Sequence, residues 1–197
     1  MQWIKRIYDW VLSWAESPYS TLALIILAFS ESSFFPVPPD VLLIALVLGK
    51  PQRAFRLAAF CSAASIIGGI AGYGIGYFIW HQVSHFFFSY IPGFTPQIFN
   101  LVQSNYQHYG FWYVLVAGFT PIPYKVFTIA AGVFQMELIP FILASVISRS
   151  ARFFIVSALL YFFGAPIKNF IDKYFNLLTF AFLGFIILGF IVIKYIF

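Results

Sequence analysis

Residues 31–40 read Glu31-Ser-Ser-Phe-Phe-Pro36-Val-Pro38-Pro39-Asp40, and residues 121–125 read Pro121-Ile-Pro123-Tyr-Lys125. Both stretches place prolines and a charge inside an apolar run. Proline ends a helix because it has no backbone N–H and its ring clashes with the preceding turn. When Pro36 is set over Pro121 without a gap, both prolines and a following Ile-Ala pair coincide, and Asp40 falls on Lys125. We interpret the two stretches as the broken centres of an internal repeat.

The composition is that of an integral membrane protein. Of the 197 residues, 62% are hydrophobic and only 9% are charged, which is too little polar surface for a soluble globule. The net charge of +5 comes from lysines and arginines scattered among apolar spans, so membrane topology and anionic lipid explain it better than nucleic acid. A single cysteine, Cys61, and three scattered histidines predict neither a disulfide nor a metal site, and no cofactor is expected.

The apolar pattern predicts an all-α, polytopic protein with about three full transmembrane helices in a single membrane domain, residues 1–197. Each break joins two apolar arms that are too short to cross a hydrocarbon layer of about 30 Å, which takes about 20 residues. Such a hairpin enters the bilayer and returns to the same face, and protein or water must cover its broken backbone. The expected segments are an amphipathic interfacial helix (1–18), a re-entrant hairpin (19–50), a transmembrane helix (53–80), an outer interfacial segment (81–109), a second re-entrant hairpin (110–134) and two transmembrane helices (138–164 and 174–197).

Basic residues predict the orientation. Lys5 and Arg6 precede the first hairpin, and Lys50, Arg53 and Arg56 follow it, so the positive-inside rule makes that face, and the N-terminus, cytoplasmic. Tryptophans on one stripe of the N-terminal segment favour a helix lying in the headgroup region; a soluble helix packed on a partner is the alternative. One crossing separates the two breaks, so the second hairpin enters from the opposite face. Inverted repeats of broken helices place transporter sites at the repeat interface.

Five ionisable residues fall at membrane depth, where such residues normally face a partner or water: Glu31, Asp40, Lys125, Arg149 and Arg152. Pairing two negative with three positive charges leaves one positive charge, which suits an anionic ligand, and guanidinium groups suit phosphate. Arg149 and Arg152 are three residues apart on one helix, so we expect them to share a headgroup. Glu31 and Asp40 are expected to couple protons or gate access. The alternative is that Glu31 with Arg149 or Arg152, and Asp40 with Lys125, are static ion pairs that fix the hairpins.

Three glycines recur every fourth residue in the first long span: Gly68, Gly72 and Gly76. Such a stripe of small residues lets another helix approach closely, so we expect it to serve helix packing.

Several motifs together resemble the DedA family (VTT-domain, SNARE-associated membrane proteins), and most its small YqaA-like branch. They are Glu31-x4-Pro36-x-Pro38-x-Asp40, Gly72-Tyr73-x2-Gly76, Phe119-Thr-Pro121-Ile-Pro123-Tyr-Lys125 through Ala131-Gly132, and Ser148-Arg149-x2-Arg152-Phe153. The resemblance covers about residues 20–165. It implies two opposed re-entrant hairpins and movement of lipids such as undecaprenyl phosphate or phosphatidylethanolamine across the bilayer, with proton-motive force implicated.

The resemblance also implies residue roles. Glu31 and Asp40 match the acidic pair of the family's first hairpin, and Lys125 stands near its second-hairpin arginine. Many members carry another arginine shortly before the second-hairpin proline, where this chain has Gly118 and Phe119.

The sequence therefore predicts a lipid transporter of the bacterial inner membrane, flippase-like or scramblase-like and proton-coupled. Lys125, Arg149 and Arg152 would bind a phosphate headgroup. A proton-coupled carrier of a small soluble anion, or a non-transporting envelope scaffold, is the alternative. A membrane enzyme is not expected, because no nucleophile-elbow, zinc-protease or phosphatase pattern occurs. The oligomeric state is left open, a homo-oligomer included.

Overall fold

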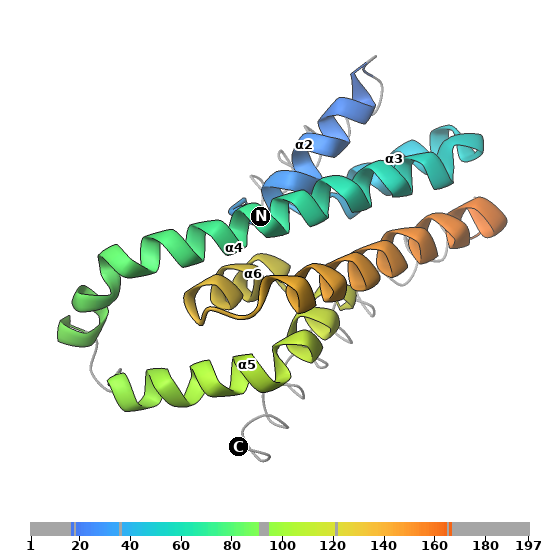
Figure 1. Ribbon diagram of the computed structural model, residues 1–197. Helices are drawn as coiled ribbons and strands as arrows, with labels where there is room; N and C mark the ends of the chain where they lie inside the picture. The colour runs from blue at the N-terminus through green and yellow to red at the C-terminus, as the bar shows by residue number, and fades with distance from the viewer. Residues whose placement is uncertain are drawn as a thin grey trace.

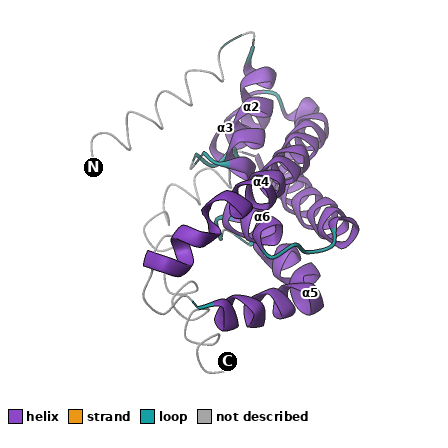
Figure 2. Cartoon of the chain, turned by 60° about the vertical axis from the view of Figure 1, so that its left-hand side comes forward, coloured by secondary structure: helices purple, strands orange, loops and turns teal. Residues whose placement is uncertain are grey.

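The computed structural model describes residues 17, 19–35, 37–90, 95–120, 122–164 and 166. The interfacial helix expected near the N-terminus, the span expected at 174–197, and Pro36 and Pro121 lie outside these residues. The described residues form helices joined by loops and contain no strand, which confirms the all-α prediction for this part (Figure 2). Its helices are α2 (Ser20–Ser33), α3 (Asp40–Gly49), α4 (Ala54–Tyr90), α5 (Pro96–Phe119), α6 (Tyr124–Val133) and a last helix, Leu138–Gly164, with a 3-10 turn at Pro51–Arg53.

Two stretches are long and apolar enough to cross a membrane, Pro51–Trp80 and Leu138–Gly164. They agree with the spans expected at 53–80 and 138–164. In Figure 1, α4 and the Leu138–Gly164 helix, which is drawn in orange, run in opposite directions. This opposite course fits the predicted inversion of the two halves.

The helix boundaries repeat between the two halves. Helices α3 and α6 are each 10 residues long. Each is followed by four residues, 50–53 or 134–137, and then by a long helix. The common pattern of a broken helix, a short helix and a long helix supports the internal repeat.

Proline and capping chemistry explain where the helices end. Helix α2 stops before the proline-rich stretch, and α3 begins directly after Pro39. Helix α6 begins after Pro123 in the same way. At the other end of the second hairpin, the Thr95 side chain accepts a hydrogen bond from the Ile98 N–H and Pro96 occupies the first turn, which is a strong start signal.

The region between the spans differs from the expected interfacial segment at 81–109. Helix α4 continues to Tyr90, and α5 begins as early as Pro96, so the arm expected to start at 110 is the second part of a 24-residue helix. Polar residues after Trp80 do not end a helix by themselves, because an exposed helix accepts them; proline and glycine are needed.

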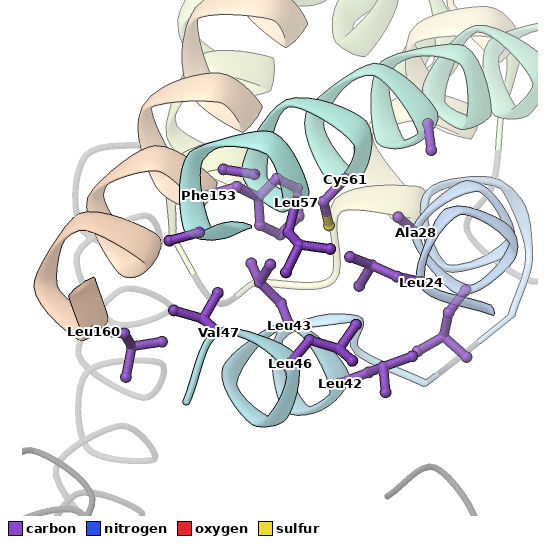
Figure 3. Close-up of a cluster of buried hydrophobic side chains, with 14 residues drawn as sticks. Leu24, Ala28, Leu42, Leu43, Leu46, Val47, Leu57, Cys61, Phe153 and Leu160 are labelled. Carbon is purple, nitrogen blue, oxygen red and sulfur yellow. The ribbon is translucent and has the colours of Figure 1, made fainter. Parts of the chain in front are cut away.

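The first hairpin and both long helices form one buried apolar cluster. Figure 3 shows Leu24 of α2, Leu43 of α3, Cys61 of α4 and Phe153 of the last helix in this cluster. A second cluster joins α5, α6 and the last helix through Val114, Ala131, Phe141 and others. The two clusters position the ends of the broken helices against the middle of α4.

Candidate functional site at the two helix breaks

Three elements bring four of the five expected charges together in two ion pairs. Glu31 lies in the last turn of α2 and Asp40 is the first residue of α3, while both arginines project from the Leu138–Gly164 helix. Arg149 pairs with Glu31 at 2.9 Å, and Arg152 pairs with Asp40 at 2.9 Å. The alternative pairing of Asp40 with Lys125 is wrong, because Arg152 occupies that carboxylate.

Arg149 is enclosed by protein. Only 2% of the residue is exposed. Its guanidinium carbon lies 4.8 Å from the centroid of the Tyr124 ring and 4.7 Å from that of Phe153. Aromatic faces attract a cation, and the attraction grows when water is excluded. Arg149 is therefore held by two ring faces, a hydroxyl and a carboxylate, and is shielded from water.

A closed ring of hydrogen bonds surrounds the Arg149–Glu31 pair. Arg149 Nε donates to the Ser65 hydroxyl, Ser65 lies 2.6 Å from the Ser32 hydroxyl, and Ser32 donates to Glu31 Oε2 at 3.2 Å. Because Ser65 accepts from a guanidinium, and Ser32 gives its proton to the carboxylate, Ser65 must donate to Ser32. The ring joins α2, α4 and the last helix in a single direction of donation, from arginine to carboxylate.

Arg152 is more accessible than Arg149 and connects the two breaks. Its Nε and Nη2 donate to the two Asp40 oxygens at 3.3 and 2.9 Å, which is a two-pronged carboxylate contact. Its Nη1 donates to the Thr120 carbonyl at 2.6 Å, directly after α5 ends. The Arg152 and Asp40 side chains are 18% and 19% exposed. One guanidinium thus spans from the start of α3 to the end of α5.

A small pocket opens beside this pair. Its volume is about 200 Å³, and its lining consists of Asp40, Phe119, Arg152, Ile155 and Val156. The pocket has one ion pair set in apolar walls, so an anion entering it would meet a guanidinium and a competing carboxylate. We expected Arg149 and Arg152 to share a headgroup. In the structure each arginine pairs with its own carboxylate, and Arg149 does not line the pocket.

Lys125 is the remaining expected cation. It is half-buried near the start of α6, and within the described part of the chain no carboxylate lies within ion-pairing distance of it. Its backbone carbonyl accepts a hydrogen bond from Thr128 at 3.0 Å.

The glycine stripe of α4 lies where both broken helices pack against it. A Cβ added at Gly68 would collide with the Phe29 carbonyl of α2, and one at Gly76 with the Ile129 carbonyl of α6. At Gly72 it would meet the Thr128 hydroxyl, which donates to the Ser32 carbonyl at 3.1 Å. The stripe therefore brings α2 and α6 to the same stretch of α4, one from each half of the molecule.

The hydroxyl groups of the site were not expected from the sequence. Ser32, Ser65 and Thr120 lie in apolar helices or at their ends, where serine and threonine are common and usually bond to their own helix. Tyr124 also bonds through its hydroxyl to Ser145 at 2.6 Å. A weak signal existed for Tyr124, since it stands beside Lys125 at the second break.

The family model described as VTT domain matches residues 35–162, which include both breaks and both arginines. An uncharacterized protein of Haemophilus influenzae is 39% identical over 159 residues, covering 81% of each chain. Another uncharacterized protein, from Histophilus somni, is 40% identical over 160 residues, covering 81% of this chain and 82% of its own. No solved structure matches the chain.

Proposed function

The chain belongs to the VTT-domain family, the domain of the DedA membrane proteins, and on that premise we propose that it moves a phosphate-bearing lipid across the bilayer. The proposed substrate is a lipid such as undecaprenyl phosphate or a phospholipid, and the proposed location is the bacterial inner membrane. In this proposal the two hairpins, each with a break at its centre, enter the bilayer from opposite faces and do not cross it. Exposed Lys50, Arg53 and Arg56 would lie on the cytoplasmic side.

The observation that supports the proposal best is the Asp40–Arg152 pair beside a pocket between the two breaks. Two oxygens of a phosphate accept the paired N–H groups of an arginine as a carboxylate does, so a phosphate can replace Asp40 on Arg152. Arg149 would not bind the headgroup directly. Its role would be to hold α2 and α4 against the last helix while Arg152 exchanges partners.

Proton coupling follows from the same exchange. When phosphate takes the guanidinium, Asp40 loses its partner while its side chain is only 19% exposed, so the unpaired carboxylate is incompletely solvated and this has a free-energy cost. Uptake of a proton by Asp40 removes that cost. Release of the phosphate on the other side lets Asp40 lose the proton and return to Arg152. Glu31 would stay paired with Arg149 unless the ring of hydroxyls opens.

The test is lipid movement in proteoliposomes that contain a fluorescent phosphatidic acid and the purified protein. Dithionite bleaches only the probe in the outer leaflet. The wild-type protein should move probe from the inner to the outer leaflet, so its vesicles should retain less fluorescence than vesicles without protein. Arg152→Ala should abolish movement, whereas Arg53→Ala, which removes an exposed cation outside the site, should not. Wild-type movement in Arg152→Ala would overturn the site assignment.

Two further measurements separate the alternatives. Uptake of labelled inorganic phosphate without lipid movement would replace the proposal by a soluble-anion carrier. The exchange variant Asp40→Arg with Arg152→Asp restores an ion pair but puts a carboxylate where phosphate should bind. A scaffold should tolerate this exchange, and a transporter should fold and fail to move lipid.

A further inference from the structure

An apolar groove runs between α4 and α6, apart from the pocket at Arg152. Its volume is about 610 Å³. The lining side chains include well-exposed ones, with Ile79 48% and Val126 57% exposed. The lining is formed by Ile75, Gly76, Ile79, Trp80 and Val83 of α4 and by Val126, Ile129, Ala130, Val133 and Phe134 of the second hairpin. Because the Pro51–Trp80 part of α4 is long and apolar enough to cross a membrane, we expect this groove to face hydrocarbon.

The groove has a fixed direction along the protein. Tyr124, at the start of α6, lies against Gly69, and Val133, at its end, lies against Gly76. Helix α6 therefore runs alongside α4 from the level of the break toward Trp80, where the apolar span ends.

The end of the groove near Trp80 is closed by aromatic rings. The Trp80 ring stacks on Phe99 of α5, with centroids 4.8 Å apart. Phe134 packs against Phe99 at 5.2 Å. These rings limit how far an occupant can extend toward the membrane surface.

The end near the break carries positive charge. Lys125 lies one turn before Ile129 on the same face of α6, and side chains of a helix tilt toward its N-terminus, away from the groove. Lys125 has no ion-pair partner among the described residues. The first turn of α6 has no side-chain cap, so the positive end of its helix dipole adds to the potential there.

We propose that the groove holds the hydrocarbon chain of a phosphate lipid with its headgroup at Lys125 and its chain directed toward Trp80. This inference rests on the proposed function and adds a lipid site with its headgroup at Lys125, separate from the exchange site at Arg152. A lipid of the ordinary annulus lies the other way round, with its headgroup at the membrane surface and its chain end at mid-bilayer. The bound lipid is thus halfway: its headgroup has reached the break, while its chain remains in the leaflet on the Trp80 side.

Two photoactivatable phosphatidic acids distinguish these orientations. One carries a diazirine at the chain end and the other carries it next to the glycerol. With full-length protein in proteoliposomes, the chain-end probe should label around Ile79, and the glycerol-proximal probe should label around Val126, as read by mass spectrometry of peptides. The reverse assignment, equal labelling by both probes, or no labelling of the groove would each overturn the inference.

Variants test the two ends separately. In Lys125→Gln the lipid should lose its preferred orientation, so the labelling pattern should be that of annular lipid. In Lys125→Arg the lipid should keep its orientation. Ile129→Trp should fill the groove and reduce labelling by both probes. Ile139→Trp is the matched control, because Ile139 is 72% exposed and does not line the groove. Unchanged orientation in Lys125→Gln would remove the lysine from the site.

The same vesicles separate this inference from the proposed function. Phosphatidic acid movement with annular labelling would leave the transport proposal standing and reject the groove. Labelling in the proposed orientation without lipid movement would keep the groove as a lipid site and reject transport.

Discussion

Removing Arg149 should lower the stability of the protein more than removing Arg152, although each arginine lies 2.9 Å from its carboxylate. The Arg149 and Glu31 side chains are only 3% and 14% exposed. Removing one partner of a buried pair costs about 3–5 kcal/mol, because the other charge is left without compensation. We expect about 3 kcal/mol for Arg149→Ala, the lower end, since Glu31 keeps its hydrogen bond from Ser32.

Arg152→Ala should cost less. Its side chain and that of Asp40 are 18% and 19% exposed, so water can solvate the remaining carboxylate, and about 1 kcal/mol is expected. For a chain of this size, each kcal/mol corresponds to about 2–4 °C in the unfolding midpoint. Arg149→Ala should therefore lower the midpoint by about 6–12 °C and Arg152→Ala by about 2–4 °C.

The assay is the loss of monodisperse protein on size-exclusion chromatography after heating in detergent. Lipid movement is measured in parallel, at a temperature below both midpoints. Arg152→Ala should be stable and inactive. Equal midpoint losses, or a larger loss for Arg152→Ala, would refute the assignment of Arg149 to structure and Arg152 to ligand exchange.

Two other predictions use the same thermal assay. Gly76→Ala should cost about 1–3 kcal/mol, because its methyl group would meet the α6 backbone; Gly74→Ala, with open space around it, should be neutral or stabilising by up to about 1 kcal/mol. If the two variants behave alike, close α4–α6 packing is not what the glycine stripe provides. Ser65→Ala should cost about 1–3 kcal/mol, because the buried Arg149 Nε–H loses its acceptor and the Ser32 oxygen loses its donor. Ser62→Ala is its control, since the Ser62 hydroxyl bonds within α4 at 2.8 Å, and an equal loss there would argue against the ring.

The positions of the helix breaks and of the two long apolar helices could be predicted because they depend on local chemistry. Prolines and the lengths of apolar runs determine where helices end, and neither depends on distant residues. The early start of α5 at Pro96 was also encoded locally, in the Thr95-Pro96 cap. It was missed because polar, aromatic residues around it favoured an interfacial segment over a helix.

The partners of the charges could not be predicted from the repeat. Aligning Asp40 with Lys125 shows that the two residues hold equivalent places in the two halves, but equivalent places need not touch. Asp40 instead meets Arg152. Likewise, because Arg149 and Arg152 are three residues apart, they lie on neighbouring parts of one helix face. Their contacts nevertheless depend on which helix lies opposite each arginine, and this is set by the tertiary structure.

The charged residues are distributed between the two halves so that the ion pairs resist separation of the halves. Glu31 and Asp40 belong to the first half, whereas Lys125, Arg149 and Arg152 belong to the second, so each of the two ion pairs joins one half to the other. Separating the halves would break both pairs and leave their charges without partners, at a cost of several kcal/mol for the buried Arg149–Glu31 pair and less for the partly exposed Arg152–Asp40 pair. Phosphate can replace the carboxylate on arginine, and a proton can neutralise the carboxylate. An opening of the Asp40–Arg152 contact is therefore least costly when a phosphate group and a proton arrive together, so under the proposed function lipid movement and proton uptake are expected to occur in one step.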